Sequence, residues 1–239
     1  MTTTTQTVRE IALDQPSSIR VFEHFGIDYC CGGRKPLAEA CAASQLEVDQ
    51  VIAALEAAEK GPLPDTIDWT TQPLAALAAH ITATHHAYVK RELPRLALLS
   101  AKVVNRHGPT HPELPILASR LALLTEELTM HLMKEEAVLF PYVSKLETAL
   151  ATGAPLPEKC FGTVANPIAM MIREHDDAGG LLAEIRTLTS NFTTPEGACP
   201  TYHAYFDGLR EFQQDLHQHI HLENNILFPR AIAIEQSTL

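Results

Sequence analysis

The sequence predicts an all-α protein with a small helical unit at residues 1–61 and an antiparallel four-helix bundle at residues 72–239. Long segments of the second part repeat apolar residues at helical spacing, and no segment shows the sustained apolar–polar alternation of a β-strand. Hydrophobic residues make up 46% of the chain, which is enough for a sizeable core. The length suits one large domain, or a large domain with a small one.

Proline and glycine positions divide the N-terminal part into short helices. Pro16 and Gly26 lie at the start and the end of one of them, where each residue is favoured. Ser44 followed by Glu47 is the capping-box pattern, which predicts the start of the last helix, and Gly61 its end. The prolines that follow predict a linker to the bundle.

Four long helical segments follow the linker, and their number and length predict the antiparallel bundle. They cover residues 72–105, 112–150, 164–192 and 200–234.

The bundle sequence contains an internal repeat. "HLMKEEAVLFP" begins at His131 and "HIHLENNILFP" begins at His219, and both fit H-x-x-x-E-x-x-x-L-F-P. His86 lies 45 residues before His131, and His175 lies 44 residues before His219. The bundle is therefore predicted to consist of two helical hairpins of the same design.

Each repeat places a histidine and a glutamate on one helix face. His131 and Glu135, like His219 and Glu223, are four residues apart and so lie one turn apart on the same side. Their neighbours on that side are apolar, which predicts that the pairs face the core; these are Leu128, Leu139, Leu216 and Leu227. Buried carboxylates are costly, and two that face each other repel, but a bound cation removes both problems.

The ligand set indicates the metal. Glu135 and Glu223 can each bridge two ions, and four histidines supply the nitrogens: His86, His131, His175 and His219. Each of two irons would then have two histidines and two carboxylate oxygens, and an oxo or hydroxo bridge would leave about one open position on each. Mixed nitrogen and oxygen ligands favour iron, whereas closed structural zinc sites usually contain cysteine.

The ligand in the first bundle helix is left open by this reasoning. His85 and His86 are adjacent and point about 100° apart, so only one is expected to face the core. The spacing favours His86 weakly. His80 is a further candidate, or a packed core histidine.

Composition excludes several partners and locations. The net charge of −11, without a cluster of Lys or Arg, argues against binding to nucleic acid or to anionic membranes. No apolar run approaches the roughly 20 residues that a membrane span needs. The first residues lack a signal-peptide pattern, and the five cysteines are odd in number and irregularly spaced. A cytoplasmic protein with free thiols is expected.

Four bundle stretches resemble a hemerythrin-like domain: "HHAYVKRELP", "HLMKEEAVLFP", "MIREHDDAG" and "HIHLENNILFP". "ALDQPSSIRVFEHFGIDYCCGG" resembles an ScdA-type N-terminal domain. The combination is similar to the RIC family, the repair-of-iron-centres di-iron proteins, and the likeness covers nearly the whole chain. It implies the same six metal ligands as the repeat.

The resemblance also implies roles for residues outside the six. The cysteine pair of the family matches Cys30 and Cys31, interpreted as a separate thiol station for iron, nitric oxide or electrons. A family histidine associated with the access route of the site matches His107, which is a further ligand candidate or a solvated loop histidine. Independently of the resemblance, the position of Asp176 and Asp177 beside His175 makes them candidates for a hydrogen bond to a ligand histidine, or solvated residues.

The function implied by the resemblance is repair of iron–sulfur clusters damaged by nitrosative or oxidative stress. Iron donation or nitric oxide chemistry at the di-iron centre, including nitric oxide reduction, would carry it. The alternative is a module that binds oxygen or nitric oxide reversibly and signals through the N-terminal domain. The expected partners are damaged iron–sulfur proteins, and a homodimer through the N-terminal unit is a further candidate.

Overall fold

The computed structural model describes residues 2–60 and 67–237. In those ranges every regular element is helical, and the only β contact is an isolated bridge between Thr7 and Pro36, so the predicted all-α class is confirmed. The predicted end of the fourth helix at Gly61, and the first half of the predicted linker, lie outside the described residues.

The N-terminal unit is a cluster of four short helices around its own apolar core. They are α1 (Val8–Asp14), α2 (Ser18–Phe25), α3 (Leu37–Ala43) and α4 (Val48–Glu59). Gly26 ends α2 in the left-handed region at φ 67°, as predicted. The core joins all four helices, and Phe22 and Tyr29 are fully buried in it.

The predicted capping box at Ser44 and Glu47 is wrong. Ser44 ends α3, and Gln45 has a φ of 55°, so the chain turns there before α4 begins. The unit does contain a capping box, at the start of α1. Glu10 N–H donates to Thr7 Oγ1 at 3.2 Å, and Thr7 N–H donates to Glu10 Oε2 at 2.8 Å.

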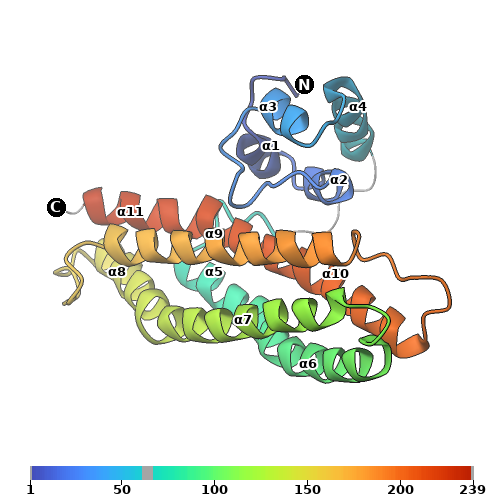
Figure 1. Cartoon of the computed structure of the whole chain (residues 1–239). Helices are drawn as coiled ribbons and strands as arrows, with labels where there is room; N and C mark the ends of the chain where they lie inside the picture. Colours follow the sequence, from blue (N-terminus) through green and yellow to red (C-terminus); the bar gives the residue numbers. More distant parts are fainter. Residues whose placement is uncertain (1, 61–66, 238–239) are drawn as a thin grey trace.

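The four bundle helices run antiparallel and are long (Figure 1). The first comprises α5 (Leu74–Ile81), η1 (Thr82–His86) and α6 (Ala87–His107). The second comprises α7 (Glu113–Lys134), η2 (Glu135–Leu139) and α8 (Phe140–Thr152). The third is α9 (Ala165–Leu188), and the fourth comprises α10 (Pro200–Leu222), η3 (Glu223–Leu227) and α11 (Phe228–Ser237). None of the helices in the described ranges is long and apolar enough to cross a membrane.

The segments η1, η2 and η3 are π-helical turns within otherwise α-helical rods. Such wide turns are rare and occur frequently at functional sites. Pro141 and Pro229 follow the second and the third of them, as the last residue of the repeated L-F-P. Proline lacks an N–H and clashes with the preceding turn of an α-helix, so a wider turn at this point relieves the conflict.

The bundle interior consists of two apolar clusters with a polar layer between them. One cluster joins α6, α7, α9 and α10 and includes Leu128 and Leu216. The other joins α5, α8, the start of α9 and α11, and includes Leu139 and Leu227. The side chains of the two H-x-x-x-E pairs lie between these clusters, as the apolar neighbours in the sequence predicted.

The N-terminal unit lies across α9 and α10 (Figure 1). Glu23 of α2 accepts a hydrogen bond from His217 Nδ1 at 2.8 Å. Asn225 Nδ2 donates to the carbonyl of Tyr29 at 3.0 Å, and Arg9 Nη2 donates to the carbonyl of Asn225 at 3.0 Å. The two units therefore meet through polar contacts close to the repeated motif of the fourth helix.

Candidate metal centre

Six side chains from all four bundle helices converge in the polar layer. They form two groups that share both glutamates: His86, His219, Glu135 and Glu223 in one, and His131, His175, Glu135 and Glu223 in the other. In each group one ligand atom from every residue lies within 4.8 Å of the others. All six side chains are buried, and the two glutamates have no exposed surface.

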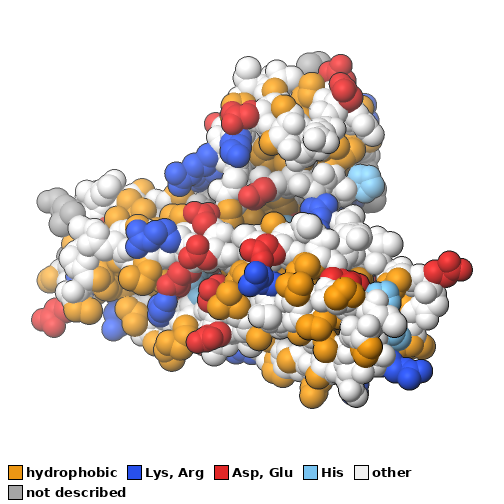
Figure 2. All heavy atoms as spheres, in the orientation of Figure 1, with side chains coloured by type: hydrophobic (Ala, Val, Ile, Leu, Met, Phe, Trp, Pro, Cys, Tyr) orange, Lys and Arg blue, Asp and Glu red, His pale blue; other side chains and the backbone are white. Residues whose placement is uncertain are grey.

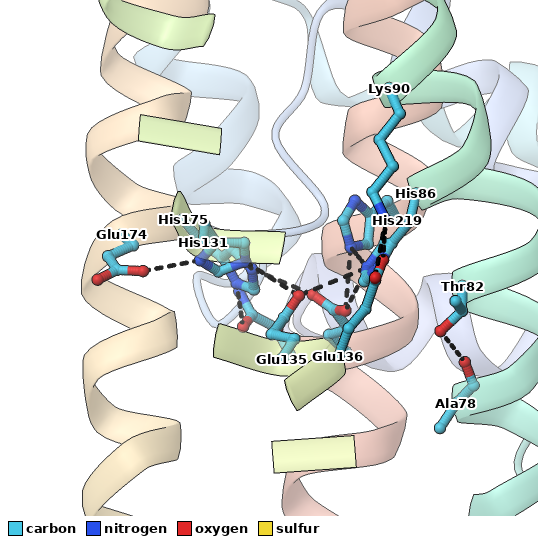
Figure 3. Close-up of polar contacts among 12 residues, drawn as sticks. Ala78, Thr82, His86, Lys90, His131, Glu135, Glu136, Glu174, His175 and His219 are labelled. Carbon is cyan, nitrogen blue, oxygen red and sulfur yellow. Dashed lines mark hydrogen bonds and ion pairs between the residues drawn. The ribbon is translucent and has the colours of Figure 1, made fainter. Parts of the chain in front are cut away.

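Glu135 lies between histidines of the two groups (Figure 3). Its Oε2 is 3.3 Å from His131 Nε2 and 3.5 Å from His86 Nε2. Neither of its oxygens has a hydrogen-bond partner within the described part of the chain.

Glu223 occupies the equivalent position in the second hairpin. Its Oε2 is 3.1 Å from His175 Nε2, and its Oε1 is 3.0 Å from His219 Nε2. Burial alone would raise the pKa of this carboxyl. The positive charge of His219 and the hydrogen bonds from the ring nitrogens outweigh burial and hold the pKa well below its usual value.

The geometry of these atoms fits a metal. His175 Nε2 lies 3.0 Å from His131 Nε2, and His86 Nε2 lies 3.2 Å from His219 Nε2, so nitrogens point at nitrogens. Two nitrogens at about 2.1 Å from one shared ion would lie at about this separation. A cation would also compensate the partnerless oxygens of Glu135.

Two of the histidines are oriented by a carboxylate that is itself held by a lysine (Figure 3). His86 Nδ1 is 2.8 Å from Glu136 Oε1, which Lys90 contacts at 2.6 Å. In the other group, His131 Nδ1 is 2.9 Å from Glu174 Oε2, and Lys134 contacts Glu174. Such contacts fix the ring so that Nε2 faces the centre.

The Nδ1 atoms of the other two histidines have no carboxylate partner among the described residues. His175 Nδ1 is 2.9 Å from Asn224 Oδ1. His219 Nδ1 has no hydrogen-bond partner among the described residues, and its ring stacks on His85 at 5.9 Å between centroids. Neither Asp176 nor the following aspartate takes the orienting role that the sequence left open.

His85 and His86 lie in different surroundings. His86 points into the centre, and His85 pairs with Asp215 at 3.0 Å. Both rings are buried, but only His86 joins the convergent side chains, as expected from the different directions of two adjacent residues on a helix. His80 stacks on Trp69 at 4.4 Å between centroids and is not part of either group.

Comparison with known proteins agrees with this geometry. Residues 77–231 match the Hemerythrin HHE cation binding domain. The chain belongs to the hemerythrin HHE family. Residues 4–59 of the N-terminal unit match ScdA_N, a domain of unknown function.

Proteins similar to this hemerythrin-family chain match nearly all of its length. The iron-sulfur cluster repair protein YtfE of Citrobacter koseri is 40% identical over 231 residues, which are 96% of this chain and 98% of that protein. The protein of the same name from Escherichia coli O81 is 40% identical with the same coverage.

His107, the seventh ligand candidate, lies away from the centre of the hemerythrin domain. It is the last residue of the 21-residue helix α6, about 30 Å along that helix from His86. Its Nε2 is 3.4 Å from Cys199 Sγ, and its ring lies beside Tyr202. It does not join the six convergent side chains.

The cysteine pair of the N-terminal unit packs against the hemerythrin domain, next to a candidate ligand. Cys31 Sγ is 3.6 Å from the carbonyl oxygen of His175, and Asn224 Nδ2 is 3.5 Å from the carbonyl of Cys30. The two sulfurs are 3.9 Å apart. A hydrogen bond with the neighbouring thiol, together with burial, raises the pKa of Cys30 well above its usual value, while the Cys31 thiol is partly exposed.

Asp28 builds the loop that carries the pair. Its Oδ1 accepts from the backbone N–H of Cys30 and of Cys31, each at 2.9 Å, and its Oδ2 accepts from that of Gly32 at 2.8 Å. A Cβ at Gly33 would lie 2.6 Å from the backbone oxygen of Tyr29, so glycine permits the close approach of the loop to itself at this position.

Proposed function

We propose that this chain is a non-haem di-iron protein that repairs iron–sulfur clusters damaged by nitrosative or oxidative stress. Iron donation, nitric oxide chemistry at the centre, or both would carry the repair. The name of the curated relatives supports the repair role. The buried histidines and glutamates, which suit iron, support the proposed cofactor.

The observation that carries the proposal is the sharing of Glu135 and Glu223 between the two ligand groups. Each glutamate lies between two histidine pairs, so each could bridge two ions. Bound iron would supply a redox-active centre with room for a small ligand. The protein provides the fixed ring orientations and the apolar clusters on both sides, which keep bulk water away.

Cys30 and Cys31 are proposed to act as the thiol station that passes iron, nitric oxide or electrons to or from the centre. The contact of Cys31 with His175 and the link through Asn224 support this role. Among the described residues neither thiol belongs to the two ligand groups, so we expect the metal to be held without the pair.

The double substitution Glu135→Leu with Glu223→Leu tests the proposal. The purified variant should bind little iron by metal analysis and should not restore activity to a damaged iron–sulfur enzyme. Glu126→Gln is the matched control, since Glu126 is exposed on α7. A double variant that still binds two irons per chain and still repairs the cluster would refute the proposal.

Reversible binding of oxygen or nitric oxide with signalling through the N-terminal unit is the second candidate. The direct contact between Cys31 and the helix turn of His175 favours it, because a shift of that turn would reach the N-terminal unit. Turnover distinguishes the two functions. A sensor forms a stable adduct, whereas nitric oxide chemistry yields nitrous oxide over many cycles under reducing conditions.

A further inference from the structure

A cavity of about 420 Å³ lies between the N-terminal unit and the hemerythrin domain, beside the cysteine pair. One side comes from α2 and the loop after it, and the other comes from α9 and α10. Figure 2 shows acidic and basic side chains along the junction of the two units. The volume lies within the range of about 300–1,000 Å³ that is typical of small-molecule sites.

The floor of the cavity under the Cys31 thiol is bare helix backbone. Gly179 and Gly180 of α9 line it. A Cβ at Gly179 would have Cys31 Sγ as its nearest neighbour, at 3.8 Å, and a Cβ at Gly180 would meet no atom within 4 Å. The space above Gly180 is therefore open and lies next to the thiol.

Two of the four charged side chains that line the cavity are already engaged. Glu23 accepts the hydrogen bond from His217, and Asp28 holds the backbone of the cysteine loop. Asp176 and Arg186 have no ion-pair partner within the described ranges. One carboxylate and one guanidinium thus remain available to a ligand.

Arg186 is held at the cavity wall. Its Nε donates to Asn191 Oδ1 at 2.8 Å, and the side chain is half-buried. Its terminal nitrogens pack over Gly26, where a Cβ would lie 2.6 Å and 2.7 Å from them. The guanidinium is therefore oriented before a ligand arrives, which reduces the entropy cost of binding.

We propose that this cavity binds a low-molecular-weight peptide thiol, or its disulfide, with a free ammonium and a free carboxylate. The carboxylate would pair with Arg186, the ammonium with Asp176, and the sulfur would lie at Cys31. Asp176 and Arg186 are ten residues apart on α9, about 15 Å along the axis. An extended tripeptide spans about 10 Å, and the side chains cover the remainder.

The bound disulfide can exchange with Cys31. The Cys31 thiol gives up its proton, its sulfur attacks one sulfur of the ligand, and the ligand S–S bond breaks. The second half of the ligand leaves as a thiolate and takes up the proton, so that a mixed disulfide remains on Cys31. Reduction by a second thiol of the same class reverses the step. Adjacent cysteines have Cα atoms about 3.8 Å apart, closer than a disulfide prefers, so Cys30 does not readily displace the ligand.

This inference rests on the thiol role in the proposed function but not on the iron chemistry. The test uses the iron-loaded full chain with oxidised glutathione and with the uncharged 2-hydroxyethyl disulfide. Peptide mapping by mass spectrometry gives the modification rate at Cys31 and at the exposed Cys160, which serves as the internal reference. The protein and oxidised glutathione both carry a net negative charge, so long-range repulsion should slow the reaction with this probe. A faster reaction of Cys31 with oxidised glutathione would therefore not arise from the overall charge of the protein.

Relative to Cys160, Cys31 should react faster with oxidised glutathione than with the uncharged disulfide. Asp176→Asn and Arg186→Gln should each reduce this preference by about fivefold, without a change in iron content or in the rate with the uncharged probe. Equal relative rates for the two probes, or variants that keep the preference, would overturn the proposal. Asp176→Asn alone decides it if Arg186→Gln does not fold. Neither outcome of this experiment tests cluster repair, which the repair assay measures separately.

Discussion

The Cys31 thiol lies 3.6 Å from the backbone carbonyl oxygen of His175, one of the candidate metal ligands. The sulfur belongs to the N-terminal unit and the histidine to the bundle, so the two halves of the chain meet at the edge of the centre. Asn224 adds a second connection, since its side chain contacts both the His175 ring and the carbonyl of Cys30.

Replacement of both Cys30 and Cys31 by serine should leave iron content unchanged and impair cluster repair. The thiols are outside the ligand groups, and serine keeps the size of the side chains. Metal analysis and a repair assay on the same preparation measure the two effects. Cys160→Ser is the control because that thiol is exposed on a distant loop. Full repair by the double variant would show that the pair only shapes a loop.

The two ligand groups should bind metal unequally. His175 has Asn224 as its orienting partner, whereas His219 Nδ1 has none among the described residues. Loss of such partners typically costs 10–100-fold in affinity, so one ion should be bound about that much more weakly. Anaerobic Fe(II) titration against a chelator should show two steps, and Asn224→Ala should weaken the tighter one. The Asn224→Asp variant keeps the acceptor oxygen and should largely preserve the affinity of the tighter step. A single uniform step in the wild type would contradict unequal binding by the two groups.

Metal uptake should release protons at neutral pH. Burial lowers the pKa of His86 and His131, but the nearby Glu135 and Glu223 outweigh it and raise the values to about 10 and about 9. Both rings therefore carry a proton in the metal-free protein, and a bound ion must displace it. Calorimetry in buffers of different ionisation enthalpy counts the protons released.

The same two histidines affect the stability of the metal-free protein. Because their pKa values are higher in the folded state, their contribution is complete below about pH 6.5 and is lost as the pH rises through 9 to 10. The midpoint of thermal unfolding of the metal-free protein should therefore fall as the pH rises through this range. The variant with Glu135 and Glu223 replaced by leucine should not show this fall, because it lacks the carboxylates that raise the two histidine pKa values.

His221 should make stability sensitive to acid. Burial lowers its pKa to about 4, and it lies under Tyr29 with its Nδ1 2.8 Å from Asn225 Nδ2. A lowered folded-state pKa contributes stability that is present above the unfolded value of about 6.5 and is lost as the pH falls through 4. Over this range the free energy of unfolding of the metal-free wild type should fall by on the order of 3 kcal/mol more than that of the His221→Phe variant. Parallel pH profiles for the two proteins would contradict the assignment.

The bundle and the six convergent side chains could be predicted from the sequence because both follow from periodic spacing. The i, i+4 pairs and the repeated motif specify which helix faces meet, and the structure places all six residues there. The π-helical turns were not predicted, because helix propensity rules assume a regular α-helix. The proline that ends each repeat was the available signal for two of them.

The orienting partners were missed for a different reason. Glu136 holds His86 from another helix, and Glu174 holds His131 likewise, so each contact depends on how the helices pack. Spacing along one helix carries no information about such contacts. The wrong capping box at Ser44 has a local cause: the preceding helix ends there, so the residue caps a C-terminus instead.

The polar layer between two apolar clusters also bears on the order of events during biosynthesis. Each cluster joins segments of all four bundle helices, so the helices can assemble around hydrocarbon before any ion arrives. The metal-free chain is therefore expected to reach the bundle fold first and to take up metal afterwards. Emptying and refilling then become repeatable events in the life of one molecule, which an iron donor requires.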